Sequence, residues 1–145
     1  MAKPKVLFLC TANSARSQMA EALLRKYAGD RFDVYSAGLE PTEVHPLAVR
    51  VMAEIGIDMA GHRAKSVSEF LGKMNPACVI TLCEETRARC PRTFPATGAT
   101  MLAWPMEDPA EAAGTEEERL EKFRQARDQI AARIRDWLDA FRSGE

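Results

Sequence analysis

Long apolar runs and an excess of charge of one sign are both absent from this 145-residue chain. No run is long enough to cross a bilayer, and too few apolar residues precede Cys10 to form a secretory signal. The 20 basic and 21 acidic residues leave a net charge of −1, which gives no reason to expect nucleic acid or an anionic membrane as a partner. We therefore expect a cytoplasmic, monomeric protein.

Internal repeats, low-complexity tracts and linkers are also absent, so residues 1–145 are expected to form one domain. The hydrophobic content of 46% is sufficient for a sizeable core. Cysteine and histidine are scarce, at four and two residues, and no C-x2-C pair occurs. This pattern argues against a metal site, and we expect neither a metal nor another cofactor.

Short apolar segments alternate with helical segments, which is typical of an α/β fold with a parallel sheet. We expect a single-domain three-layer sandwich, with a four-stranded parallel sheet and helices on both faces. Thr115 and Glu118 fit a capping box, and apolar residues then recur at helical spacing from Leu120 to Phe141. The expected strands are Val6–Leu9, Phe32–Gly38, Ala77–Leu82 and Thr100–Trp104, and the helices before the last are 17–27, Pro46–Ile55, Ser66–Leu71 and Glu84–Arg89.

The run Cys10-Thr11-Ala12-Asn13-Ser14-Ala15-Arg16-Ser17 lies between an expected strand and an expected helix. The backbone N–H groups of such a loop can converge on one point, and the helix adds the positive end of its dipole. Arg16 can hold two oxygens of a tetrahedral anion. A lone cysteine at a strand end is usually a small buried hydrophobe, but these donors stabilise a thiolate. We therefore expect Cys10 to be a nucleophile of low pKa, and residues 11–17 to bind an oxyanion.

Two further cysteines flank a short polar segment after the third strand. The carboxyl ends of parallel strands line one crevice, so Cys83 and Cys10 can face each other across one site. Cys90 lies seven residues beyond Cys83, which corresponds to about 10 Å of helix rise. A disulfide needs Cα atoms within about 7 Å, so this pair can form only if the helix unwinds. Cys78, inside the strand, is expected to belong to the core.

Asp108 precedes Pro109 after the fourth strand. A carboxylate on a rigid turn beside the crevice can move protons to or from a leaving group. Aspartate is equally favoured before proline as a simple turn residue, and the sequence leaves both readings open. His45 and His62 fall in expected loops and receive no chemical role.

Together these features resemble the thioredoxin-coupled arsenate reductases, which share the fold of the low-molecular-weight protein tyrosine phosphatases. The resemblance runs nearly end to end. It departs at Ala12 and Ala15, where well-known relatives have glycine and cysteine. The loop is common to both families, whereas the pair Cys83 and Cys90 distinguishes the reductases. The segments that carry the resemblance are Cys10–Ser17, Val79–Cys83, Cys90-Pro91, Asp108-Pro109 and Gly114–Glu118.

The resemblance implies a relay of three cysteines that reduces arsenate. Cys10 would attack arsenate, and Cys83 would then attack the Cys10 sulfur and release arsenite. Cys90 would attack Cys83 in turn, which frees Cys10 and leaves a Cys83–Cys90 disulfide for thioredoxin. Asp108 would assist proton transfer, while Asn13 and Ser17 would hold the loop. Some relatives bind potassium beside the loop. Lys65 occupies the aligned aspartate position here, so no metal is expected.

Two other functions use the same loop. A phosphatase acting on phosphotyrosine or a small phosphoester would need Cys10, Arg16 and Asp108, but it leaves Cys83 and Cys90 without a role. A noncatalytic module would bind phosphate or another tetrahedral oxyanion, but it does not explain a thiol at the base of the loop. The sequence therefore favours the reductase, with arsenate and thioredoxin as its partners.

Overall fold

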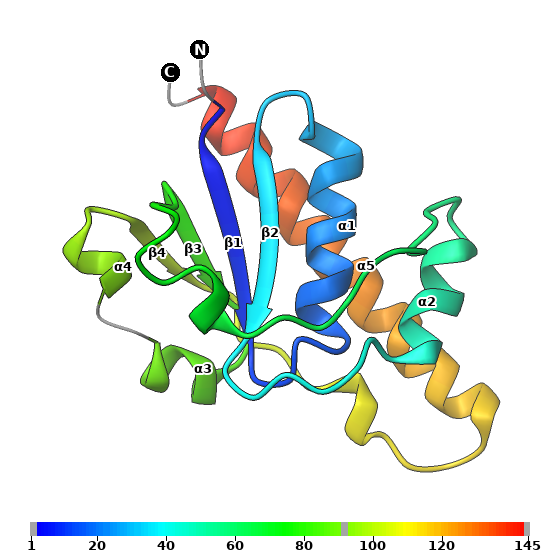
Figure 1. The fold of residues 1–145 in the computed structure, drawn as a ribbon. Coiled ribbons are helices and arrows are strands. Elements are labelled where there is room, and N and C mark those ends of the chain that lie inside the picture. The colour runs from blue at the N-terminus through cyan, green and yellow to red at the C-terminus, as the bar shows by residue number, and fades with distance from the viewer. Residues whose placement is uncertain (1–2, 91–92, 144–145) are drawn as a thin grey trace.

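The computed structural model describes residues 3–90 and 93–143. Its centre is a sheet of four parallel strands in the order β2-β1-β3-β4 (Figure 1). The strands are β1 (Lys5–Cys10), β2 (Asp33–Gly38), β3 (Cys78–Thr81) and β4 (Thr100–Ala103). The expected four-stranded parallel sheet is confirmed. Because all strand pairs are parallel, the residues that follow β1 and β3 emerge at one edge of the sheet.

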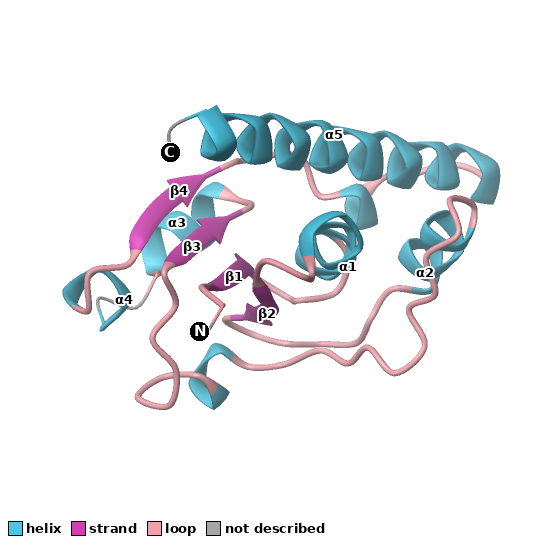
Figure 2. Ribbon diagram, turned by 90° about the horizontal axis from the view of Figure 1, so that it is seen from above, coloured by secondary structure: helices cyan, strands magenta, loops and turns pink. Residues whose placement is uncertain are grey.

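Strand β1 is buried between two apolar clusters, because successive side chains of a strand point to opposite faces. Val6 and Phe8 face the larger cluster, whereas Leu7 and Leu9 face the smaller one. Figure 2 shows the three longest helices together on one side of the sheet. They are α1 (Arg16–Ala28), α2 (Pro46–Ala53) and α5 (Glu116–Ser143), and the shorter ones are α3 (Glu84–Arg89) and α4 (Thr93–Ala96).

Helix α5 begins at the predicted capping box. The N–H of Glu118 donates to Thr115 Oγ1 at 3.1 Å, and the N–H of Thr115 donates to Glu118 Oε1 at 3.2 Å. The predicted apolar stripe packs into the larger cluster through Leu120, Phe123, Ile130, Ile134 and Leu138, with Trp137 partly buried against it. The side chain of Phe141 lies outside the described residues.

The structure differs from the prediction in short segments. Residues 66–71 form only the 3₁₀ turn Val67–Glu69, which begins with a capping box between Ser66 and Glu69. Helix α4 and the 3₁₀ turn Pro109–Glu111 were not predicted. The expected helix stop at Pro91 lies outside the described residues. Within the described ranges, no helix combines the length and apolar character that crossing a membrane requires.

Gly38 ends β2 directly opposite Cys10, and the following loop crosses it at close range. A Cβ atom added at Gly38 would lie 2.7 Å from the carbonyl oxygen of Thr11 and 2.8 Å from the backbone nitrogen of Asn13. Both contacts are with backbone, which no side-chain rotation can relieve. The absence of a side chain at Gly38 therefore sets the path of the loop.

We expect Gly38→Ala to displace this loop. It should lower the free energy of unfolding by about 1–3 kcal/mol through overpacking, and weaken phosphate binding by about tenfold or more. Chemical denaturation and titration calorimetry measure the two effects. Gly72→Ala is the control, because Gly72 has a φ of 73° and open space around it. This control should lose stability but keep phosphate binding. Unchanged phosphate binding by Gly38→Ala would contradict the role given to Gly38.

Candidate active site

The loop between β1 and α1 is fixed on its outer side by the segment after β2. Strand β1 ends at Cys10 and α1 begins at Arg16. Backbone N–H groups donate to three loop carbonyl groups, from Glu40 to Thr11, from Thr42 to Ala12 and from His45 to Ser14, at 2.8, 3.0 and 3.0 Å. In the opposite direction, the N–H of Ala12 donates to the Cys10 sulfur. The loop therefore offers a backbone donor at the position where the sequence predicts an anion site.

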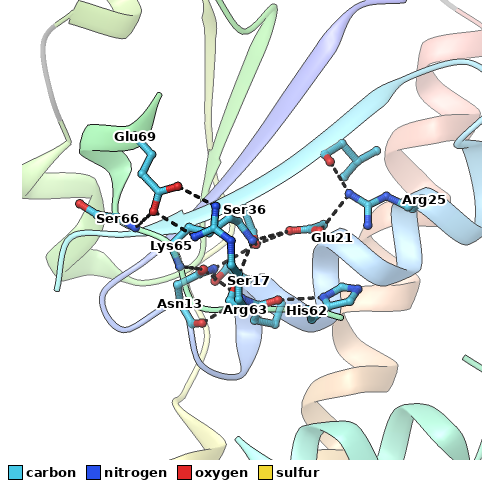
Figure 3. A network of polar contacts seen from close by, with 12 residues as sticks. Asn13, Ser17, Glu21, Arg25, Ser36, His62, Arg63, Lys65, Ser66 and Glu69 are labelled. Carbon is cyan, nitrogen blue, oxygen red and sulfur yellow. Dashed lines mark hydrogen bonds and ion pairs between the residues drawn. The ribbon is translucent and has the colours of Figure 1, made fainter. Parts of the chain in front are cut away.

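Asn13 supports the loop from behind (Figure 3). Its φ of 50° is the only positive value at a non-glycine position among the described residues. Asparagine tolerates this left-handed conformation better than most residues. Its amide nitrogen donates to Ser17 Oγ at 2.8 Å and to Ser36 Oγ at 3.0 Å. Its amide oxygen accepts from Gln18 Nε2 at 2.9 Å and from the N–H of Lys65 at 2.8 Å. Asn13 and Ser17 thus contact each other behind the loop.

A buried ion pair lies beside this network. Glu21 is only 5% exposed, and Lys65 Nζ lies 3.3 Å from its Oε1 atom. The same ammonium lies 3.4 Å from Ser36 Oγ and 3.1 Å from the carbonyl oxygen of Arg63, while Arg25 pairs with Glu21 Oε2 at 2.9 Å. A potassium ion would meet the charge of Lys65 here, so these residues do not fit a bound monovalent cation. The part of the chain that the structure describes also contains no group of three or more His, Cys, Asp or Glu residues able to hold a metal.

A cavity of about 580 Å³ opens over the loop. It includes most of the residues that the sequence predicts for the site, but not Asn13, Ser17 or Cys90. Four lining residues were not predicted, namely Thr42, His45, Ala110 and Glu111. The predicted residues that line it are Cys10, Thr11, Ala12, Ser14, Ala15, Arg16, Cys83 and Asp108. Residues from the ends of β1, β3 and β4 thus meet at one site.

Arg16 is held rigidly at the wall of this cavity. Its Nη1 donates to the carbonyl oxygen of Met106 at 3.0 Å, and its Nη2 lies 3.6 Å from Asp108 Oδ2. The Nε atom is buried and has no acceptor among the described residues. Asp108 is fixed in turn, because its Oδ1 accepts from the N–H of Ala110 at 3.0 Å. The guanidinium therefore keeps one buried donor available for an oxyanion, with a carboxylate beside it.

Cys10 and Cys83 form a hydrogen-bonded pair of thiols in the cavity. Cys10 is 2% exposed, and Cys83 is half-buried at the start of α3. The Cys83 sulfur also lies 2.7 Å from Thr86 Oγ1 and 3.5 Å from Thr11 Oγ1. The sequence prediction that Cys10 and Cys83 can face each other across one site is therefore confirmed.

The predicted low pKa of Cys10 is wrong for this arrangement. The hydrogen bond with Cys83 and burial raise the pKa of Cys10, and they outweigh Arg16 and the N–H of Ala12, which lower it. The pKa of Cys83 falls to about 4, first through the hydrogen bond with Cys10 and then through the hydroxyl groups of Thr11 and Thr86. Two thiols in contact share one proton, and the two hydroxyl groups favour the negative charge on Cys83.

The remaining cysteines lie away from the cavity. Cys90 caps the C-terminal end of α3, half-buried against the smaller apolar cluster, and burial raises its pKa. All six residues of α3 separate it from Cys83, as predicted. Cys78 lies buried in β3, and burial raises its pKa to about 11. Cys78 is therefore a core residue, as expected.

His45 lines the cavity, although the sequence analysis assigned it no role. Its Nδ1 accepts from the N–H of Leu47 at 3.1 Å, which caps α2 and leaves Nε2 to carry the proton of the neutral ring. The ring centroid lies 4.7 Å from that of Phe123, and burial lowers the pKa of His45. The signal in the sequence is its place directly before Pro46, because proline favours the first turn of a helix and the preceding residue is then the N-cap.

Comparison with known proteins connects this geometry to a family. The family model for the low molecular weight phosphotyrosine protein phosphatases matches residues 5–144. An arsenate reductase from Halalkalibacterium halodurans is 44% identical over 140 residues, which cover 96% of this chain and 98% of that protein. The structure of an arsenate reductase in the phosphate-binding state has a TM-score of 0.80 and 32% identity, covering 94% of this chain and 98% of that one. A thioredoxin-dependent arsenate reductase from Corynebacterium glutamicum has a TM-score of 0.69 and 30% identity, covering 99% of this chain and 64% of that protein.

We expect Lys65→Met to destabilise the fold by leaving Glu21 with fewer partners. Breaking a buried pair from one side is costly, although Arg25 still contacts Glu21, so a loss of about 2 kcal/mol is expected. Urea denaturation measures it. The control is Lys3→Met, because Lys3 and Asp33 form an exposed pair at 3.6 Å. That change should cost about 0.5 kcal/mol or less. Equal stabilities of the two variants would show that Lys65 does not serve as the cation of this site.

Proposed function

The chain belongs to the low molecular weight phosphotyrosine protein phosphatase family and, within it, to the arsenate reductases, and we propose that it works by a relay of three cysteines regenerated by thioredoxin. The observation that carries this proposal is the Cys10–Cys83 pair in a cavity shared with Arg16. The thioredoxin dependence of the related Corynebacterium glutamicum protein supports the choice of reductant.

In the first step, Cys10 attacks arsenate. The buried Nε of Arg16 and the N–H of Ala12 stabilise the oxyanion, as fixed donors do in a site that excludes water. The Cys10 sulfur forms a bond to arsenic and displaces one hydroxyl group of hydrogen arsenate. The thiol proton leaves with that hydroxyl group as water, and Asp108 relays it within the cavity. Cys10 must give up its proton as its sulfur attacks, because the thiolate and not the thiol is the nucleophile.

In the second step, the Cys83 thiolate attacks the Cys10 sulfur. The bond between sulfur and arsenic breaks, and its electron pair stays on arsenic, which passes from the +5 to the +3 state. Arsenite leaves and takes up protons from solvent, while the two thiols are oxidised to the Cys10–Cys83 disulfide. This step needs a thiolate next to Cys10, and the contacts of Cys83 with Thr11 and Thr86 favour that form.

In the third step, the Cys90 thiolate attacks the Cys83 sulfur and Cys10 leaves as a thiolate. The six residues of α3 keep Cys83 and Cys90 apart, so the helix must unwind before they can pair. Unwinding is feasible because α3 is short and isolated helices of this length are marginal in water. A dithiol of thioredoxin then reduces the Cys83–Cys90 disulfide.

A phosphatase reaction is the alternative, because the family model and the trio of Cys10, Arg16 and Asp108 are compatible with it. It leaves the contact between Cys83 and Cys10 without a purpose. We therefore place phosphoester hydrolysis second and use it as a reference activity that needs Cys10 but neither of the other two thiols.

Cysteine variants distinguish the two functions. Cys10→Ser should abolish both arsenate reduction and aryl phosphate hydrolysis, because both begin with attack by its sulfur. Cys83→Ser and Cys90→Ser should each stop multiple turnover of arsenate while sparing hydrolysis of a simple aryl phosphate. Coupled assays with thioredoxin, thioredoxin reductase and NADPH measure the first activity.

Cys78→Ala serves as the matched control, since it removes a thiol from the core and should turn over arsenate. Full arsenate turnover by Cys83→Ser and Cys90→Ser would contradict the three-cysteine relay and favour the phosphatase function. Arsenate reduction by Cys10→Ser would exclude Cys10 as the first nucleophile.

Oxidation should unwind α3. Formation of the Cys83–Cys90 disulfide is expected to increase amide hydrogen exchange in residues 84–90 and their neighbours, while the central strands keep their protection. Exchange measured on the reduced and oxidised protein, with the disulfide verified by mass spectrometry, tests this. Equal protection of residues 84–90 in both states would mean that the cysteines pair without loss of the helix.

A further inference from the structure

We propose that Thr86 is a positioning residue for the resolving thiol: its hydroxyl group holds the Cys83 sulfur against Cys10 and stabilises its thiolate form. This inference rests on the proposed relay, in which Cys83 is the second nucleophile. None of the sequence motifs pointed to Thr86, and it does not line the cavity itself.

Three side-chain atoms from two segments form a compact cluster. The Cys83 sulfur lies 2.7 Å from Thr86 Oγ1 and 3.5 Å from Thr11 Oγ1, and the two hydroxyl oxygens lie 3.4 Å apart. Thr11 belongs to the loop after β1, whereas Thr86 belongs to α3. The cluster therefore connects the helix that carries the resolving cysteines to the loop that carries Cys10.

Thr86 is unusual for its helix. Glu84, Ala88 and Arg89 of α3 are exposed, whereas Thr86 is completely buried. Burying a hydroxyl group costs free energy unless it is hydrogen-bonded, and this hydroxyl group contacts a sulfur and another hydroxyl group. The strongest acceptor within reach is Cys83 in its thiolate form. A buried donor aimed at the sulfur therefore favours that form over the thiol.

The titratable groups that share the cavity with Cys83 come from several elements, and they include His45 and Glu111. Cys10 at the end of β1, Arg16 at the start of α1 and Asp108 after β4 line the same cavity. Arg16 and Asp108 are paired with each other at 3.6 Å. Thr86, in α3, contributes a neutral hydrogen-bond donor. Its hydroxyl group helps to lower the pKa of Cys83.

The position of Thr86 also links this contact to the fold of α3. Cys83 is the N-cap of the helix and Thr86 is its third residue, so their side chains meet only while the first turn is helical. When α3 unwinds, Cys83 loses this donor. The hydroxyl group is thus present when Cys83 must attack and is withdrawn after Cys83 has become part of a disulfide.

The test compares Thr86→Val, which keeps the shape and removes the hydroxyl group, with Thr86→Ser, which keeps the hydroxyl group. Iodoacetamide alkylation of Cys83, followed by peptide mass spectrometry across a range of pH, reports its thiolate fraction without requiring turnover. Thr86→Val should raise the pH of half-maximal reactivity by about one unit, which is about a tenfold drop in thiolate below that pH. Thr86→Ser should restore the parent profile.

Thr81→Val is the matched control. Thr81 is also a buried threonine, but its hydroxyl group donates to the carbonyl oxygen of Leu102 at 3.4 Å and not to a sulfur. Its alkylation profile should match that of the parent. A Thr86→Val profile that also matches the parent would overturn the proposal. If Thr86→Val does not fold, Thr86→Ala replaces it with the same expected shift.

Steady-state kinetics give a second readout. Thr86→Val should move the acid limb of the kcat–pH profile for arsenate up by about one pH unit, with little change in KM and little change in kcat at neutral pH, where Cys83 stays ionised. A loss of kcat that is independent of pH would indicate a merely structural role and overturn the proposal. The proposed function is tested independently by Cys83→Ser. Arsenate turnover by that variant would contradict the relay, whatever the alkylation profile of Thr86→Val.

Discussion

The hydrogen bond between the side chains of Cys10 and Cys83 is the contact on which the rest of the site depends. It joins the end of β1 to the start of α3 and leaves one negative charge to be shared by two sulfurs. Each further contact determines how that charge is divided. Arg16 and the N–H of Ala12 act on Cys10, while Thr11 and Thr86 act on Cys83. In the proposed relay, these contacts favour the thiolate form of Cys83, which is the form that the second step requires.

This pair is useful only if the loop is rigid, and the network behind the loop supplies that rigidity. Asn13 takes the left-handed conformation within the loop, whereas Ala12 does not. Glu21 and Lys65 then bring a buried charge pair to the back of the same network. The ammonium group of Lys65 therefore balances the buried charge of Glu21 at this position. In contrast, α3 is a short helix of six residues, and the proposed relay requires it to unwind.

The sheet could be predicted from the sequence because its strands are apolar on both faces and end at turn residues. The meeting of Cys10 and Cys83 followed from a general rule, since both residues follow parallel strands. The partners of these cysteines could not be predicted in the same way. Thr86 lies in a polar hexapeptide, and nothing in that composition indicates which side chain turns inward. Lys65 and Glu21 are 44 residues apart in sequence, so their pairing depends on the folded path of the chain.

The division of the proton between the two thiols also lay beyond the sequence. Motif logic places the thiolate on Cys10, because the loop, the helix and Arg16 all favour an anion there. Contact with a second thiol reverses that assignment, since the hydroxyl groups of Thr11 and Thr86 favour the anion on Cys83. Such a competition is decided by distances between side chains, which a linear motif does not contain.

The most direct test of the relay is a single turnover of arsenate in the absence of any reductant. The reduced protein is mixed with excess arsenate, arsenite is quantified, and the disulfide is located by peptide mass spectrometry. The relay predicts one arsenite per protein molecule, a Cys83–Cys90 disulfide, and free thiols at Cys10 and Cys78. Formation of arsenite without a disulfide, or with a disulfide that excludes Cys83, would contradict it.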